Sequence, residues 1–294
     1  MIEDFSKWLI GDNLDILSTR AADLTLLKYP GTYEFTGDYE RDEYTQNLSD
    51  DKLADKLSYY KDNPLTYKLN SDGFRTSDEF KDGGEVNIFL GCSNSFGYGM
   101  HQHHTWTHKL HNEISSTEKY WNLSVPGNGI DSDFRTLYYI LKKYGKNIKV
   151  KNIFHYARIY HRFEFYDSQG PVILSPGSIG AFKKTVFKNL LMEDVNMKKN
   201  YISSLNAIEN ISNEFNSNYY VNNLQYNVVA DTLKPLHGYD IHNSPHLYLS
   251  TKNWNPKLRG LPARDLSHHG YLEHHRLFSL FLNMYNKNYK KRYL

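Results

Sequence analysis

Between residues 85 and 156, short apolar runs alternate with stretches in which apolar residues recur at helical spacing. Residues 85–90 form a largely apolar run that ends at a glycine, as is typical of a buried strand. A loop rich in Gly and His follows, after which Trp106, Leu110 and Ile114 recur every four residues. This spacing places the three side chains on one face of a helix. The pattern therefore predicts a strand followed by a helix.

A second helix and two more strands are predicted downstream. Residues 121–125 and 148–156 predict the strands. Four apolar residues share one face of the helix between them: Phe134, Leu137, Tyr138 and Leu141. Asp131 or Ser132 is the expected N-cap of this helix. Such alternation indicates right-handed βαβ units, so we expect an α/β fold in which a mainly parallel sheet carries helices on both faces.

The remainder of the chain divides into an extension and the rest of a main domain. Residues 1–64 are rich in charge and irregular in pattern, and they predict an N-terminal extension that packs onto the main domain. The main domain is expected over 65–294, with an insertion around 170–198. A helix over 205–215 and a strand within 219–229 are expected to follow the insertion. The apolar stripe of a closing helix is formed by Leu277, Leu280, Phe281 and Met284.

Composition excludes several classes of protein. The 294 residues include 35 Lys+Arg and 33 Asp+Glu, a near-neutral balance that argues against nucleic acid as the main partner. A single cysteine excludes an internal disulfide framework and a four-cysteine zinc site. No apolar run approaches the roughly 20 residues of a membrane span, so no membrane partner is expected. The acidic start lacks the features of a secretory signal, which favours a cytoplasmic or virion-associated location over secretion.

The loop after the first predicted strand carries the first group suited to catalysis. Open parallel sheets place their sites beyond the carboxyl ends of the strands. Ser93 follows the strand end within a loop that holds Gly91, Gly97 and Gly99. Its hydroxyl is expected to be exposed, and its N–H to point at a negative oxygen. The alternative is an ordinary turn or capping serine.

Two further segments supply complementary groups. Gly127, after the second strand, offers an unobstructed N–H to the same oxygen, although it also fits an ordinary turn. Asp265 and His268 lie three residues apart before the last helix. At this spacing a carboxylate can orient an imidazole, which can then take a proton from a serine. The alternative is that Asp265 or Ser267 caps the helix.

Together these segments resemble the SGNH (GDSL-like) hydrolases. Residues 87–99, NIFLGCSNSFGYG, resemble the family's first block, a strand followed by G-D-S-x-T-x-G-x-G. Residues 122–127, NLSVPG, are similar to the second block, N-x-G-x-x-G, and residues 265–268, DLSH, match the last block, D-x-x-H. Residues 69–75, LNSDGFR, resemble the N-x-x-G-F-R element of carbohydrate-esterase-like members. The resemblance covers about residues 65–285.

The resemblance implies a three-layer α/β/α flavodoxin-like sandwich and ester hydrolysis without a metal or other cofactor. Carried over, Ser93 is the nucleophile and His268 the general base that later acts as the acid. Asp265 would fix the tautomer of the imidazole. The Ser93 and Gly127 N–H groups would form two parts of the oxyanion hole.

Two positions depart from the family pattern. The third block, G-x-N-D, supplies an oxyanion-hole Asn, but residues 154–162 contain no Asn. Asn128, Arg158 or a rearranged loop remain as possible substitutes. Cys92 stands where the family carries an Asp that is mainly structural. Its thiol is expected to be buried in the turn, so this change bears on loop geometry more than on chemistry.

The expected substrate is a small-molecule or glycan ester with a short, acetyl-like acyl group. This expectation follows from the family and from the N-x-x-G-F-R element, and Tyr98, Trp106 and Trp254 are the aromatic residues expected to border the cleft. Two alternatives stay open. An O-acyltransferase would use the same residues with a sugar hydroxyl in place of water. A non-catalytic glycan-binding or structural protein, such as a virion component, would retain the fold alone. The oligomeric state is not predicted.

Five histidines crowd the segment after Ser93: His101, His103, His104, His108 and His111. The last three have i, i+4 and i+7 spacing, so one helical face would present two ligands to a metal. No Asp, Glu or Cys complements them at an established spacing, and a polar wall of the cleft or plain surface is the preferred interpretation. No metal site is predicted. His269 is an alternative base, which the D-x-x-H spacing disfavours.

Overall fold

In a computed structural model the chain adopts an α/β fold. The structure describes residues 31–34, 45–115, 117–157, 162–167, 170–174, 194–223, 255–264, 266 and 268–287. The strands are β1 (Gly31–Glu34), β2 (Thr66–Leu69), β3 (Gly84–Gly91), β4 (Lys119–Asn122), β5 (Ile148–Ala157), β6 (Phe163–Asp167), β7 (Gly170–Leu174) and β8 (Asn218–Asn223). The α-helices are α4 (Asp51–Asp62), α5 (Ser93–Phe96), α6 (Trp106–Ile114), α7 (Ile130–Tyr144), α10 (Asp194–Glu214) and α12 (Tyr271–Asn286). Short 3-10 turns are η1 (Phe80–Asp82), η2 (Gln102–His104), η3 (Gly145–Asn147) and η4 (Pro256–Leu258).

A four-stranded parallel sheet forms the centre of the fold. Its strand order is β4-β3-β5-β8, and all three pairings are parallel, which confirms the predicted parallel sheet. The strand predicted over 121–125 lies two residues earlier, at Lys119–Asn122. Beyond its end the Leu123 N–H still donates to the Phe89 carbonyl at 2.9 Å, and the Val125 N–H to the Gly91 carbonyl at 3.1 Å. The backbone therefore follows β3 as far as the first residues of the candidate site.

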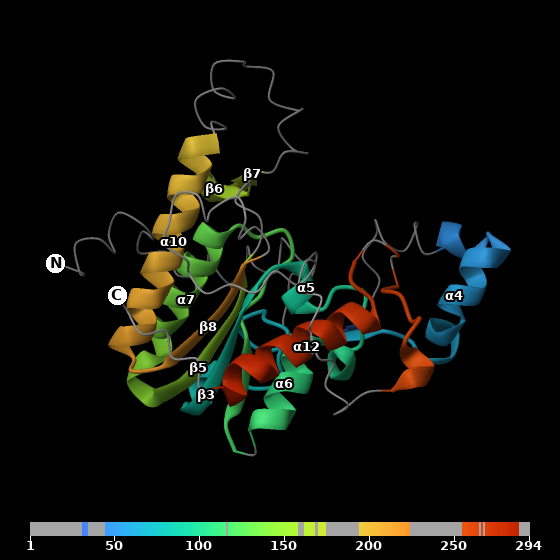
Figure 1. Ribbon diagram of the computed structural model, residues 1–294, viewed down its shortest axis with the longest axis horizontal. Helices are drawn as coiled ribbons and strands as arrows, with labels where there is room; N and C mark the ends of the chain where they lie inside the picture. The colour runs from blue at the N-terminus through green and yellow to red at the C-terminus, as the bar shows by residue number, and fades with distance from the viewer. Residues whose placement is uncertain are drawn as a thin grey trace.

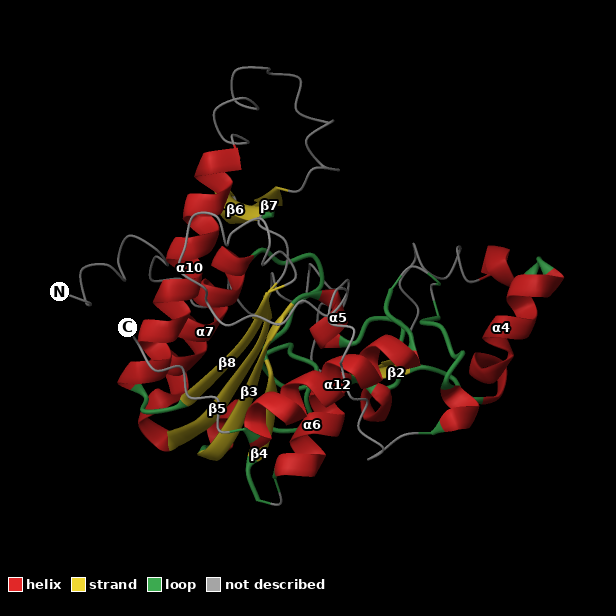
Figure 2. Ribbon diagram, in the orientation of Figure 1, coloured by secondary structure: helices red, strands yellow, loops and turns green. Residues whose placement is uncertain are grey.

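Helices cover both faces of this sheet (Figures 1 and 2). Ile88 and Leu90 of β3 belong to the apolar cluster that includes residues of α7 and α10. Phe89, between them in sequence, belongs to the cluster formed with α6 and α12. This alternation follows from the pleat, which sends successive side chains to opposite faces. Across the second cluster, the ring centroid of Trp106 lies 4.5 Å from that of Phe281.

The predicted cap of α7 was wrong. The helix begins at Ile130, and its N-cap is Gly129, which has no capping side chain. Asp131, inside the first turn, accepts from the Ser132 N–H at 2.9 Å, from the Glu164 N–H and, at 3.2 Å, from Asn200 Nδ2. Burial raises the pKa of this carboxyl to about 6. Asp131 thus joins α7 to β6 and α10, a tertiary role that local sequence rules do not contain.

Helix α4 lies within the predicted extension, at residues for which the sequence predicted no helix. Asp50 caps it, accepting from the Lys52 N–H at 2.9 Å. The Tyr60 hydroxyl donates to the Pro262 carbonyl at 2.7 Å, and Leu57 is fully buried. The division at residue 64 stays a prediction. Most of the predicted insertion lies outside the described residues.

The N-x-x-G-F-R element, residues 70–75, forms a tight turn that places Arg75 in the core. Asn70 Oδ1 accepts from the Asp72 N–H at 3.1 Å and from the Phe74 N–H at 3.0 Å. The Arg75 guanidinium, 1% exposed as a residue, donates to the carbonyls of Phe96 at 2.9 Å and Gly97 at 2.6 Å. It also donates to the Met100 carbonyl at 2.7 Å. Burial lowers the pKa of Arg75 to about 10, so it stays charged at neutral pH.

No helix in the described parts of the chain is both long and apolar enough to cross a bilayer. The longest, α10, has 21 residues, and several of them are charged.

Replacing Arg75 by Met should destabilise the fold strongly. The change leaves buried carbonyls without their donor, and each such loss costs about 1–3 kcal/mol, so we expect a loss of about 3 kcal/mol or more. Arg276→Met is the matched control, because Arg276 pairs with Glu273 on the surface and should cost less than about 1 kcal/mol. Urea unfolding followed by circular dichroism measures both. Equal stability of the two variants would show that Arg75 does not hold the loop.

Candidate functional site

The order of strands in the sheet reverses direction at β3. From β3 the chain adds β4 on one side, and it then places β5 on the other side of β3. In open parallel sheets, ligands bind beyond the carboxyl ends of the strands at such a reversal. Ser93 follows β3 directly, and α5, which begins at Ser93, lies at this end of the sheet (Figure 1). Ser93, the nucleophile expected from the sequence, therefore lies at the end of the sheet where ligands bind in open parallel sheets.

A glycine is required where β3 turns into α5. Gly91 has a φ of +139°, a conformation that L side chains rarely adopt. A Cβ at this position would lie 2.4 Å from Ser95 Oγ and 2.9 Å from the Tyr156 carbonyl oxygen. The Ser95 and Phe96 N–H groups donate to the Cys92 carbonyl at 2.9 Å and 2.8 Å. The first block thus produces a sharp strand-to-helix turn.

Ser93 is buried, whereas the sequence predicted an exposed hydroxyl. The residue is only 4% exposed. The chain folds back at Gly97, and the Gly97 and Tyr98 N–H groups donate to the Ser93 carbonyl at 2.8 Å and 2.9 Å. The Ser93 carbonyl is thus held by the end of α5. Cys92 is also buried, as expected, and its Sγ lies 3.7 Å from Ser93 Oγ.

The second block lies beside the first. Asn122 Nδ2 donates to the Ser95 carbonyl at 3.1 Å, which ties the end of β4 to α5. Gly127 is exposed, with a φ of +86°, and a Cβ there would have no atom within 4 Å. Asn128 is buried, and its Nδ2 donates to Asp133 Oδ1 at 3.2 Å. Of this block, Gly127 therefore faces open space, while the side chain of Asn128 is engaged with α7.

The last block reaches the same loop from the other end of the chain. The Arg264 N–H donates to the Gly99 carbonyl at 2.9 Å. The ring centroid of His268 lies 4.8 Å from that of Tyr98, and His268 is half-buried. His268 is thus brought beside the loop that begins at Ser93. Asp265, Arg158 and Trp254 lie outside the described residues.

One expected cleft residue belongs to the core instead. Trp106 is fully buried and stacks on Phe281. Its helix packs against α12, so the indole faces the interior rather than a cleft. Tyr98 is half-buried and lies beside His268.

The histidines do not form the helical row suggested by their spacing. Thr105 caps α6, so His104 belongs to η2 and does not share a helix with His108 and His111. No group of three His, Cys, Asp or Glu side chains among the described residues is arranged to hold a metal ion. Burial lowers the pKa of His104 to about 3 and that of His108 to about 4, so both rings are neutral at physiological pH.

Sequence reasoning missed two polar side chains next to Ser93. Asn94 is 1% exposed and Ser95 is fully buried. Within the described structure, neither the Asn94 amide nor Ser95 Oγ has a hydrogen-bond partner. Buried polar groups are almost always bonded, so these atoms are available to water or to a ligand. The only signal in the sequence was their position directly after the serine.

A buried His–carboxylate pair was also missed. His155 Nε2 lies 3.2 Å from Asp133 Oδ2, and His155 Nδ1 lies 2.7 Å from the Tyr219 hydroxyl. The pair links β5, α7 and β8 inside the core. Its two members come from different elements, so no local motif could reveal it.

Gly91→Ala should destabilise the turn that carries Ser93. The strained φ alone costs about 1–3 kcal/mol, and the contact with Ser95 Oγ adds to it. Gly260→Ala is the control, since a Cβ at Gly260 would have nothing within 4 Å. Thermal unfolding should separate the two variants clearly. Equal melting temperatures would contradict this geometry.

Comparisons with known proteins found no match to this chain. No family model matches it, and no curated protein or solved structure is significantly similar. The chemistry assigned to Ser93 and its neighbours therefore depends on the residues and contacts of this chain.

Proposed function

We propose that the protein is a serine esterase of the SGNH type, which hydrolyses a small acetyl-like ester carried by a carbohydrate. Ser93 Oγ attacks the ester carbonyl while His268 takes its proton. His268 then gives that proton to the departing alkoxide. In the second half, His268 deprotonates a water, which attacks the acyl-serine and releases the acid. Asp265 is the carboxylate that orients the imidazole, and no metal or other cofactor is required.

The observation that carries the proposal is the meeting of the first and last blocks. The Arg264 N–H bonds to the Gly99 carbonyl at 2.9 Å, and the His268 ring lies against Tyr98. In an arbitrary chain nothing requires residues near 95 and 265 to lie next to each other. A nucleophile and its base, in contrast, must lie next to each other. The reversal of strand order at β3 supports the same location for a site.

Two backbone donors are proposed for the oxyanion hole. The Ser93 N–H begins α5, where the first N–H groups have no acceptor within the helix. The Gly127 N–H belongs to a residue in open surroundings. For the Asn that the third block lacks, Asn94 is our preferred substitute, because its buried amide adjoins Ser93 and lacks a partner among the described residues. Asn128 is less suited, since it binds Asp133.

The strand order supports the finer fold assignment. Numbered along the sheet-forming part of the chain, β4-β3-β5-β8 reads 2-1-3-4. This is the start of the 2-1-3-4-5 order of flavodoxin-like folds. Helices on both faces make the three layers that such a fold requires.

The 4% exposure of Ser93 has two consequences. For an esterase or an O-acyltransferase, little room at the hydroxyl favours a short acyl group. It equally favours the second candidate, a non-catalytic binding protein that keeps the fold. Activity measurements separate the two.

Hydrolysis of 4-nitrophenyl acetate and of an acetylated sugar should be carried out by the wild type and depend on Ser93 and His268. Ser93→Ala and His268→Ala should each lower kcat/KM by at least about 10³-fold, because the two groups act as a unit. Cys92→Ser and His269→Ala are the neighbouring controls and should stay within a few-fold of the wild type.

Circular dichroism of each variant checks that it folds. A folded wild type without activity on either ester would favour the binding protein. Loss of activity in Cys92→Ser, with activity retained in Ser93→Ala, would make the protein a cysteine enzyme.

A further inference from the structure

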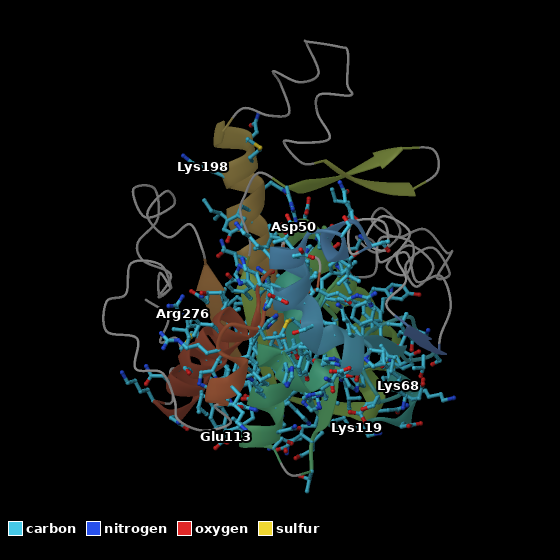
Figure 3. All side chains as sticks on the ribbon, turned by 90° about the vertical axis from the view of Figure 1, so that its right-hand side faces the viewer. Asp50, Lys68, Glu113, Lys119, Lys198 and Arg276 are labelled. Carbon is cyan, nitrogen blue, oxygen red and sulfur yellow. The ribbon has the colours of Figure 1, made fainter. Side chains whose placement is uncertain are left out.

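A polar pocket lies between η2, α6, η4 and the start of α12. Its volume is about 230 Å³, and it opens to solvent. Helices α6 and α12 contact each other (Figure 1), and their labelled residues Glu113 and Arg276 lie on the same flank of the molecule in Figure 3. The polar residues that line the pocket are His103, His104, Lys109, Asn112, Asn255 and Tyr271. None of these residues has a part in the proposed ester hydrolysis.

Lys109 is the unusual member of this set. It is 5% exposed, and its ammonium lies 3.7 Å from the centroid of the Tyr271 ring. Within the described structure its Nζ has no hydrogen-bond partner. Lysines are almost never buried unless they are paired. Among the described residues the ammonium therefore meets the face of the Tyr271 ring and no hydrogen-bond acceptor.

Other polar groups surround Lys109 in the pocket. His104 is 7% exposed, and its Nδ1 likewise has no partner among the described residues. The ring of His103 lies 4.1 Å from that of His104, and His103, Asn112 and Asn255 are exposed at the rim. None of the described lining residues is acidic. Such a set suits a negatively charged ligand and repels a cation.

We propose that this pocket binds a small oxyanion, a tetrahedral or a carboxylate group, with the Lys109 ammonium as its main partner. Ionised hydrogen bonds of this kind are the strong ones, and a pocket that already holds the donors loses little on binding. The volume accommodates such a group with accompanying water, which occupies about 30 Å³ per molecule. The proposal is independent of Ser93.

The charge state of Lys109 predicts how binding depends on pH. Burial lowers the pKa of Lys109 to about 7. His103 and His104 face it from η2, and Tyr271 and His274 from α12. Burial lowers the pKa of each of these three histidines, so they are largely neutral above pH 7. His274 Nδ1 also accepts from the Trp106 N–H at 3.2 Å. The bound anion favours the ammonium, so binding takes up a proton, and affinity should fall about tenfold per pH unit above pH 7.

Sulfate and acetate are suitable probes because neither titrates between pH 6.5 and 8.5. Calorimetric titration of the full chain should show saturable binding at pH 6.5 that weakens towards pH 8.5. Sulfate favoured over acetate identifies a tetrahedral group as the ligand, and the reverse order a carboxylate. Ser93→Ala should bind as the wild type does, which keeps this test separate from the esterase assay.

Lys109→Met should abolish binding, while Lys142→Met, which removes an exposed lysine of α7, should not change it. Asn112→Asp is a second variant, since it adds a negative charge at the exposed rim without touching the core, and it should weaken binding about tenfold or more. Absence of saturable binding to the wild type, or equal binding by wild type and Lys109→Met, would overturn the proposal. Binding that does not weaken with pH would also contradict it.

Discussion

The hydrogen bonds from Arg75 to the loop after Ser93 are the constraint on which the proposed site depends. A buried guanidinium satisfied by the carbonyls of Phe96, Gly97 and Met100 fixes the path of the chain where α5 ends. Its charge adds strength to each bond, and its planar fork adds direction. A Lys in its place would offer a point charge and could not hold the same carbonyls together.

Other segments of the chain form hydrogen bonds with the loop that Arg75 fixes. The Gly99 carbonyl accepts from the Arg264 N–H, and the Tyr60 hydroxyl donates to the Pro262 carbonyl, so the loop, α4 and the segment before α12 are tied together. On its other side, Asn122 binds the Ser95 carbonyl and aligns the end of β4 with α5. Residues from four distant segments are held around the loop after Ser93. The proposed mechanism needs such an arrangement to bring its nucleophile, base and backbone donors together.

The central fold could be predicted because its signals are local and repeated. The apolar run at 85–90 and the four-residue spacing from Trp106 to Ile114 identify β3 and α6 from short windows of sequence. Helix α4 was missed because only Leu57 and Tyr60 are buried, so charged residues dominate its pattern. The cap of α7 was mispredicted because the helix begins at Ile130, before both predicted capping residues, and because Asp131 also bonds to β6 and α10, which local sequence rules do not contain.

Prediction of the candidate site from local sequence patterns was limited in the same way. The blocks around Ser93, Gly127 and His268 could be found by their motifs, but the burial of Ser93 could not be predicted from the first block alone. The pocket around Lys109 combines residues near 104, 109, 255 and 271, and a lysine on an amphipathic helix gives no sign of being buried.

Location of the reactive atom tests the proposed mechanism most directly. The full chain is treated with a fluorophosphonate, digested, and the peptide that holds Cys92 and Ser93 is examined by mass spectrometry. The mechanism predicts a single covalent adduct on Ser93 that is not formed in His268→Ala. An adduct on Cys92, or an unmodified peptide from folded wild-type protein, would contradict it.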